Sequence, residues 1–191
     1  MNALKAWIIL IGVPVLCVLV FFWLAPPRHN PFAPVDLTEP PGLGTWHQLT
    51  RAKKNRELCF TALDEAGVLY TPLEDQDMAG SCGLYDALTL DQTLTPYSAP
   101  LRMTCAQAAA LYTWERHVAR PAALDIFGSP IARIETYGSF SCRNIAGTRR
   151  MSQHGLGNAI DIAGFRLEDG RFVNVKSHWD AGGAEQKFLR R

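Results

Sequence analysis

The first stretch of the chain is a continuous apolar run. No charged side chain lies between Ala6 and Ala25, and Trp7 and Trp23 lie near its two ends. A helix of this length spans roughly 30 Å, the thickness of a bilayer core, and tryptophan favours the headgroup level. The alternative is a cleaved signal peptide, whose apolar region is shorter, about 7–15 residues, and ends at small residues. This run ends in Ala25-Pro26-Pro27-Arg28, so residues 1–25 are interpreted as an uncleaved membrane anchor.

The second stretch, residues 26–44, is rich in proline. It holds six of the twelve prolines together with Gly42 and Gly44. This composition favours an extended, polyproline-like segment. We therefore predict a linker that lacks a packed core and holds the rest of the chain off the membrane.

The third stretch, residues 45–191, alternates between helical and strand-like periodicity. Helix-like spacing predicts one helix from Thr45 to Gly67, a long helix from the Thr104–Gln107 capping box through Pro121 to Gly128, and a last helix over 184–191. Alternating or apolar runs predict strands over 68–71, 131–137, 159–165 and 171–175. The order of elements indicates an α+β domain with helices packed on a small antiparallel sheet.

Charge and length narrow the class of protein. The 191 residues suffice for one domain with additions, and the formal net charge is only +1. A nucleic-acid partner normally requires a basic face, so this class is disfavoured. A hydrophobic fraction of 48% with 19% charged residues argues against disorder over most of the chain.

The cysteines indicate the compartment. Four of the five lie in residues 45–191, namely Cys59, Cys82, Cys105 and Cys142. An even number suits an oxidising compartment, whereas four buried free thiols in a cytosolic domain are the alternative. We predict that this part lies outside the cytoplasm and forms at least one disulfide. The three ways of pairing four cysteines stay open.

The chemistry-bearing residues gather between positions 137 and 161. His154 lies in a glycine-flanked loop, and Asp161 interrupts an apolar strand. A buried carboxylate needs a partner, and a neutral imidazole with a carboxylate suits zinc. The alternative is that Asp161 caps a turn and His154 is a hydrogen-bonded loop histidine. The spacing alone does not decide between these interpretations.

Two motifs resemble known families. Ser152-x-His154-x-x-Gly157-x-Ala159-x-Asp161 resembles the first zinc motif of the D-alanyl-D-alanine carboxypeptidases, which are grouped with lysostaphin-type endopeptidases and the hedgehog fold. More closely, residues 46–191 resemble the bacterial extensin-like C-terminal domain family. That resemblance includes Cys82-Gly83, the Cys105 helix with Trp114, Gly138-Ser139-Phe140-Ser141-Cys142-Arg143, and Ser152-Gln153-His154 through Gly164-Phe165.

The resemblance implies a role for each matching residue. His154 and Asp161 would be metal ligands for zinc, Ser152 would orient a ligand, and Arg143 would hold a substrate carbonyl or terminal carboxylate. The apolar run and the cysteines predict a single-pass inner-membrane protein with its domain in the periplasm, and the resemblance implies that this domain is a zinc-dependent, peptidase-like one that acts on peptidoglycan stem peptides. The alternative is a noncatalytic peptidoglycan-binding or scaffold domain that keeps the same fold.

The last ligand of such a site is not evident in the sequence. The related metallopeptidases complete their site with a histidine near the C-terminus, commonly in a His-x-His pair. Here no histidine follows His178. We therefore expect a C-terminus that lacks a last strand and a third ligand. His178 either substitutes for that ligand or is a solvated loop histidine.

Overall fold

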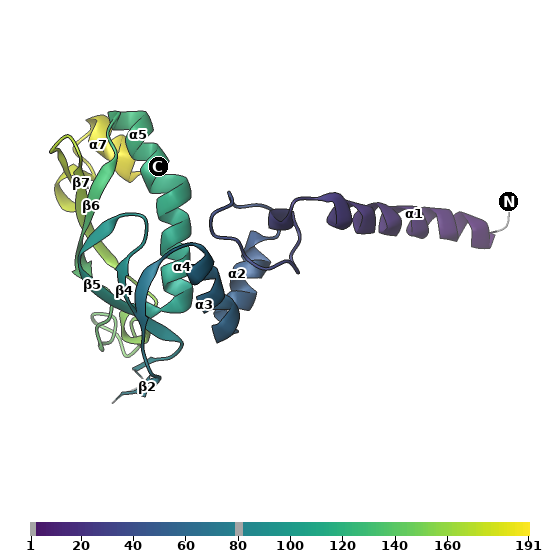
Figure 1. Ribbon diagram of the computed structural model, residues 1–191, viewed down its shortest axis with the longest axis horizontal. Helices are drawn as coiled ribbons and strands as arrows, with labels where there is room; N and C mark the ends of the chain where they lie inside the picture. Colours follow the sequence, from purple (N-terminus) through teal and green to yellow (C-terminus); the bar gives the residue numbers. More distant parts are fainter. Residues whose placement is uncertain (1–2, 79–81) are drawn as a thin grey trace.

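The computed structural model describes residues 3–78 and 82–191, with side chains from residue 10 onward within the first helix. That helix, α1 (Ala3–Leu24), projects from a body in which helices cover one side of a sheet (Figure 1). Among the residues described, no helix combines the length and apolar character of a membrane span. Trp7 lies outside the residues whose side chains are described.

The body contains six α-helices and eight strands within the described residues. The helices are α2 (Thr45–Lys53), α3 (Arg56–Glu65), α4 (Cys105–Trp114), α5 (Arg120–Phe127), α6 (Val175–His178) and α7 (Gly183–Leu189). The strands are β1 (Leu69–Pro72), β2 (Gln76–Asp77), β3 (Gly83–Leu84), β4 (Ala87–Gln92), β5 (Pro96–Thr104), β6 (Ile131–Gly138), β7 (Asp161–Leu167) and β8 (Phe172–Asn174). The α+β class is therefore confirmed.

The main sheet is mixed, which corrects the expectation of an antiparallel sheet. Its order is β1-β4-β5-β6-β7-β8, and β5 pairs with β6 in parallel while the other neighbours are antiparallel. The parallel pair arises because α4 and α5 carry the chain back across the sheet before β6 begins, as a parallel connection requires. β2 and β3 form a separate two-stranded sheet.

The first predicted helix is two helices. The break falls at Asn55, whose side chain accepts a hydrogen bond from the Leu58 N–H at 3.1 Å and so caps α3. Thr45 is not a helix cap, because its hydroxyl accepts from the Gly42 N–H at 2.8 Å. Asparagine is among the best N-cap residues, so at Asn55 the chain starts a new helix and does not continue the first one.

The long second helix begins as predicted and passes through its proline. The Thr104 hydroxyl caps α4 by accepting from the Gln107 N–H at 3.2 Å. Between α4 and α5 lies a π turn, η2 (Glu115–Ala119), in which the Arg120 N–H donates to the Glu115 carbonyl. The wider turn accommodates Pro121 near the start of α5, where its missing N–H does little harm. The helix then ends at Gly128, as predicted.

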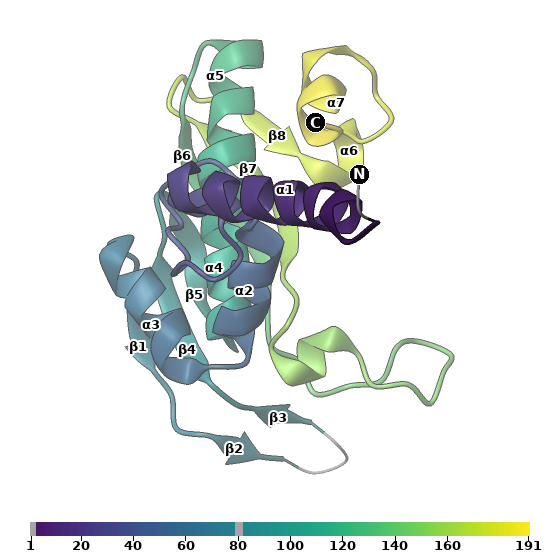
Figure 2. The same ribbon diagram turned by 90° about the vertical axis from the view of Figure 1, so that its right-hand side faces the viewer.

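The proline-rich segment is folded against the body, which corrects the expectation of a linker without packed side chains. Val35 and Leu37 are buried in the main core. The buried Gln48 of α2 donates from Nε2 to the carbonyls of Pro27 and Asn30, each at 2.8 Å. Because those side chains and carbonyls find partners, the segment leaves the polyproline-like state. We call residues 26–46 the collar. It lies between α1 and the body and includes a 3₁₀ turn, η1 (Pro27–His29) (Figures 1 and 2).

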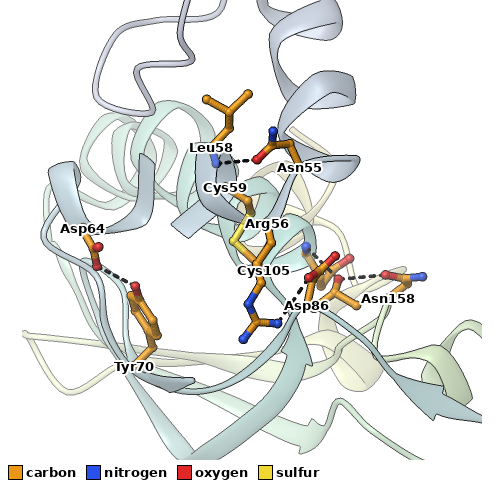
Figure 3. Close-up of a disulfide and its surroundings, with 11 residues drawn as sticks. Asn55, Arg56, Leu58, Cys59, Asp64, Tyr70, Asp86, Cys105 and Asn158 are labelled. Carbon is orange, nitrogen blue, oxygen red and sulfur yellow. Dashed lines mark hydrogen bonds and ion pairs between the residues drawn. A yellow bond between two sulfur atoms is a disulfide. The ribbon is translucent and has the colours of Figure 1, made fainter. Parts of the chain in front are cut away.

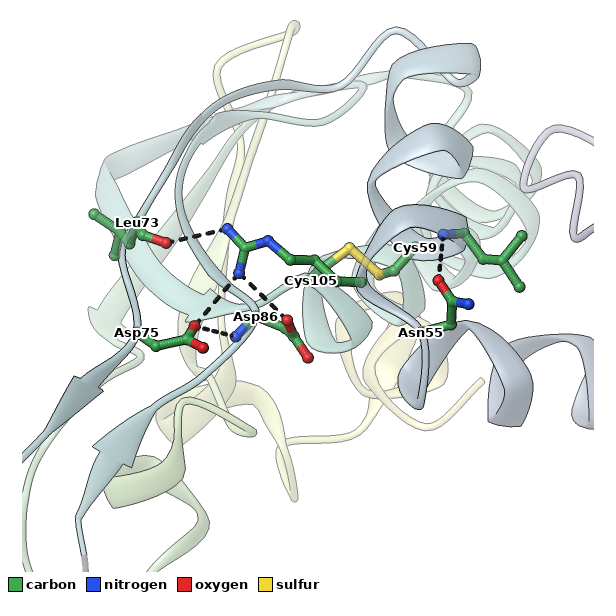
Figure 4. A network of polar contacts seen from close by, with 8 residues as sticks. Asn55, Cys59, Leu73, Asp75, Asp86 and Cys105 are labelled. Atoms are coloured by element: carbon green, nitrogen blue, oxygen red, sulfur yellow. Dashed lines mark hydrogen bonds and ion pairs between the residues drawn. A yellow bond between two sulfur atoms is a disulfide. The ribbon is translucent and has the colours of Figure 1, made fainter.

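Two disulfides fasten the body, as the cysteine count predicted. Cys59–Cys105 joins α3 to α4 (Figure 3), and Cys82–Cys142 joins the β3 region to the loop after β6. Beside the first disulfide, Arg56 contacts Asp75 at 3.4 Å, Asp86 at 3.3 Å and the Leu73 carbonyl at 3.3 Å (Figure 4). This network ties α3 to the segment between β1 and β4.

Candidate functional site

A small cavity lies where β6 ends and β7 begins. Its volume is about 150 Å³. In the register of the two strands, Gly138 at the end of β6 faces Asp161 at the start of β7. The lining residues are Tyr137, Gly138, Ser139, Phe140, Ser141, Arg143, His154 and Asp161. The segment that the sequence singled out therefore does form one concave site.

His154 and Asp161 converge in this cavity. His154 Nε2 lies 3.4 Å from Asp161 Oδ1, and His154 Nδ1 lies 2.6 Å from the carbonyl oxygen of Ser139. A carbonyl only accepts hydrogen bonds, so Nδ1 carries a proton and donates it. Nε2 then faces a carboxylate oxygen. Two arrangements are compatible with these contacts. In one, a protonated imidazole donates from Nε2 to Asp161. In the other, a metal cation lies between Nε2 and the carboxylate and is bound by both.

The distance between the two groups fits a shared metal ion. Two ligand atoms at ~2.1 Å from a tetrahedral zinc ion lie roughly 3.4 Å apart. The Ser139 carbonyl holds the imidazole in the tautomer that leaves Nε2 available, as partners outside the ligand sphere commonly do. The expectation that Asp161 is a buried carboxylate is wrong, because it is the first residue of β7 and its side chain is half exposed. His154 is mostly buried, so the pair is open to solvent from the carboxylate side.

The loop that carries His154 is held mainly by backbone contacts. It forms a short 3₁₀ helix, η3 (Gln153–Leu156), capped by the Ser152 hydroxyl, which accepts from the His154 N–H at 3.3 Å. Two further bonds tie the loop to the chain after β6: the Ser141 N–H donates to the His154 carbonyl, and the Ser152 N–H donates to the Arg143 carbonyl, each at 3.1 Å. The buried Ser152 thus positions His154 through the backbone.

Gly157 ends η3 in a conformation that suits glycine. Its φ is +65°, and a Cβ at this position would lie 2.6 Å from Leu84 Cδ2. A residue with a side chain would be strained there and would also collide with the core. The tight approach brings the loop against β3, so the position of His154 depends on packing around Leu84.

His178 does not complete a metal site. Its Nδ1 accepts a hydrogen bond from the Asn174 N–H at 3.1 Å, within the turn that opens α6. Throughout residues 3–78 and 82–191, no group of three or more His, Cys, Asp or Glu side chains is arranged to hold a metal ion. The interpretation of His178 as a third ligand is therefore not supported, and the two ligands proposed here are His154 and Asp161.

Two polar features of the structure escaped sequence reasoning. The Ser139 carbonyl orients His154, while the buried Ser139 hydroxyl donates to the Arg102 carbonyl at 2.7 Å and anchors that turn. Glu115 is fully buried in the π turn η2. Every residue has a backbone carbonyl, so the sequence cannot single out that of Ser139. Glu115 lies in a helical pattern in which glutamate is common, so the sequence does not indicate that it is buried.

Comparison with known proteins places the chain in a family. The family described as Extensin-like protein C-terminus matches residues 57–191, which include the cavity and all four disulfide cysteines. The chain belongs to this family. No curated protein and no solved structure matches it. The region that matches the family starts within α3, so α1 and the collar lie outside it. We call the matched region the extensin-like domain.

Proposed function

We propose that this chain is a membrane-anchored cell-wall protein whose extensin-like domain is a zinc-dependent, peptidase-like domain for peptidoglycan stem peptides. The observation that supports the proposal is the convergence of His154 Nε2 and Asp161 Oδ1 at 3.4 Å in a cavity that Arg143 also lines. The donor set, an imidazole nitrogen and a carboxylate oxygen, is one that zinc accepts. When bound, zinc polarises a carbonyl and makes a bound water acidic.

The residues of the chain have separate parts in this proposal. His154 and Asp161 would hold the ion, and the Ser139 carbonyl would keep the imidazole in the required tautomer. Arg143 would bind the terminal carboxylate or a carbonyl of the peptide through its forked donors. A cavity of about 150 Å³ accommodates one amino-acid end of a peptide and excludes a folded chain.

Zinc binding by the full chain tests the site. Wild type in detergent should bind zinc in a titration, weakly if only two protein ligands contribute. His154→Ala and Asp161→Asn should each reduce the affinity at least about tenfold, because outer-shell changes alone cost about that much. His178→Ala is the matched control and should bind as wild type does. Equal binding by His154→Ala and wild type would overturn the metal site and favour the His154–Asp161 ion pair.

The location of the domain is part of the proposal. The uncharged run of residues 6–25 would anchor the chain in the inner membrane, with the extensin-like domain in the periplasm. The two disulfides support an oxidising compartment. A reporter that is active only in the periplasm, fused after Arg191, should be active. An active cytoplasmic reporter at the same position would contradict this location.

A noncatalytic peptidoglycan-binding or scaffold domain is the second candidate. It is favoured by the Arg143 lining of the cavity, because a guanidinium binds a peptide carboxylate without a metal. Sedimentation with purified peptidoglycan in the presence of a chelator separates the candidates. Binding that survives chelation, is lost in Arg143→Ala and is accompanied by no released peptide supports this candidate. Chelator-sensitive release of stem-peptide fragments supports the zinc-dependent one.

A further inference from the structure

The collar exposes three large apolar side chains. Phe32 is 79% exposed, and Leu43 and Trp46 are each 75% exposed. Trp23, at the end of α1, is 83% exposed. Three of these side chains lie within residues 32–46, on one short segment, which is more than the single scattered exposures usual on a protein surface.

These side chains are carried by a segment that is fixed to the body. Arg51 donates from Nη1 to the Phe32 carbonyl at 2.6 Å, which holds the Phe32 backbone against α2. A Cβ on Gly42 would lie 2.6 Å from the Arg28 carbonyl oxygen, so the two limbs of the collar are in close contact. The backbone that carries these apolar side chains is therefore held in place by the fold, whereas a flexible linker would leave their positions undefined.

Two further hydrogen bonds place Leu43 beside the residues that follow α1. The Leu43 N–H donates to His29 Nδ1 at 3.2 Å, and the Gly44 N–H donates to the Arg28 carbonyl at 2.9 Å. Arg28 and His29 follow Leu24, the last residue of α1, by only four and five positions. In Figure 1 the collar and α2 are the parts of the chain nearest to α1, and Figure 2, seen from that side, draws α1 in front of the other helices.

We propose that Phe32, Leu43 and Trp46 insert into the interfacial layer of the membrane that α1 enters, and so seat the extensin-like domain on the lipid surface. This inference rests on the membrane anchor in the proposed function. Continuity with the anchor favours lipid as the occupant, and tryptophan and phenylalanine are the side chains that favour this layer.

The charge of the neighbouring residues suits an anionic lipid surface. Residues 26–54, the collar and α2 with the residue after it, carry a net charge of +2. The basic residues are Arg28, Arg51, Lys53 and Lys54, and the acidic ones are Asp36 and Glu39. Cations within a Debye length of anionic headgroups are attracted to them. Insertion of the three apolar side chains would also fix the distance between the cavity and the membrane. With a flexible linker that distance would vary.

Depth-dependent quenching in vesicles tests the proposal. The full chain is reconstituted into vesicles of equal parts phosphatidylcholine and phosphatidylglycerol that contain spin-labelled lipid. A fluorescent dye is attached at Leu43→Cys or Trp46→Cys in a Cys17→Ser background, in which the four other cysteines remain in disulfides. The matched control is Leu69→Cys, an exposed leucine on β1, because the sheet lies on the far side of the helices from α1 (Figure 1).

We expect headgroup-proximal spin labels to quench dyes at positions 43 and 46 several-fold more than the dye at position 69. Equal quenching at all three positions would overturn the proposal, as would strong self-quenching at position 43 without lipid quenching, which indicates contact between two copies. The native Cys17, exposed on α1, reports separately on the anchor. A Cys17 dye quenched by deep spin labels, with position 43 unquenched, overturns the seating alone. An unquenched Cys17 overturns the anchor as well.

Discussion

Glu115 is a carboxyl group buried with incomplete hydrogen bonding. It is fully buried in the π turn, where Oε2 accepts hydrogen bonds from the Thr93 hydroxyl and, at 3.1 Å, from the Tyr97 hydroxyl. Within the described part of the chain, Oε1 is buried without a hydrogen bond, and the equally buried Thr95 hydroxyl lies near this carboxyl group. Burial raises the pKa of Glu115, against the opposing effect of these hydroxyls and of Arg120.

The sign of the pH dependence follows from that shift. Because the pKa is higher in the folded state, its contribution to stability is full below the ordinary glutamate pKa. It is lost as the pH rises through the folded pKa, since the unfolded chain releases the proton first. Each unit of separation between the two values changes the free energy of unfolding by about 1.4 kcal/mol. Glu115→Gln keeps the shape, cannot ionise and offers an amide donor to Thr95.

Urea unfolding of the full chain in detergent, with disulfides intact, measures this effect between about pH 4 and pH 8. We expect Glu115→Gln to gain stability relative to wild type as the pH rises, by about 1.4 kcal/mol for each unit by which the folded pKa exceeds the unfolded one. Glu115→Ala should lose about 3 kcal/mol or more at every pH, because it leaves a cavity and unpaired hydroxyls. Glu57→Gln makes the same chemical change at an exposed position and serves as the control. If the free energy of unfolding changes with pH in the same way for Glu115→Gln and wild type, the reasoning is refuted.

Two further predictions concern the loop that carries His154. The double variant Cys82→Ser/Cys142→Ser removes a cross-link across 60 residues, and the chain-entropy model predicts a loss of about 4 kcal/mol in chemical unfolding; a loss as small as that of an exposed Ser177→Ala control would contradict it. Gly157→Ala should destabilise the protein by more than the roughly 1–2 kcal/mol of a left-handed alanine, because its Cβ meets Leu84 as well. Gly170→Ala, with φ +89° and open space around the Cβ, is the matched control in thermal unfolding, and equal losses in the two variants would show that Leu84 yields.

Local patterns determined much of the secondary structure. The Thr104 cap, the Gly128 helix end, the β6 strand and the hairpin of β7 and β8 were all predictable, because each depends on neighbouring residues alone. Disulfide bonding was also predictable, because it follows from the even number of cysteines in residues 45–191. The resemblance of residues 46–191 to the extensin-like family was also readable, and the family match over 57–191 confirms it.

Long-range contacts decided the rest. The sequence of residues 26–44 suggests a spacer, yet Val35 and Leu37 reach the core and Gln48 satisfies two carbonyls of the collar. No local rule anticipates this, because the partners lie about twenty positions apart or on another element. The parallel pairing of β5 with β6 likewise depends on how the α4–α5 crossover packs.

The candidate site divides along the same line. Residue types made His154 and Asp161 candidates, because zinc accepts an imidazole and a carboxylate, and the resemblance to a zinc motif gave them the role of ligands. Only the tertiary structure decided that the two lie 3.4 Å apart, and that the Ser139 carbonyl orients the imidazole. It also decided that His178 binds its own turn. Sequence specifies chemistry residue by residue, whereas the distance between two side chains depends on strand register and loop packing, which are properties of the whole domain.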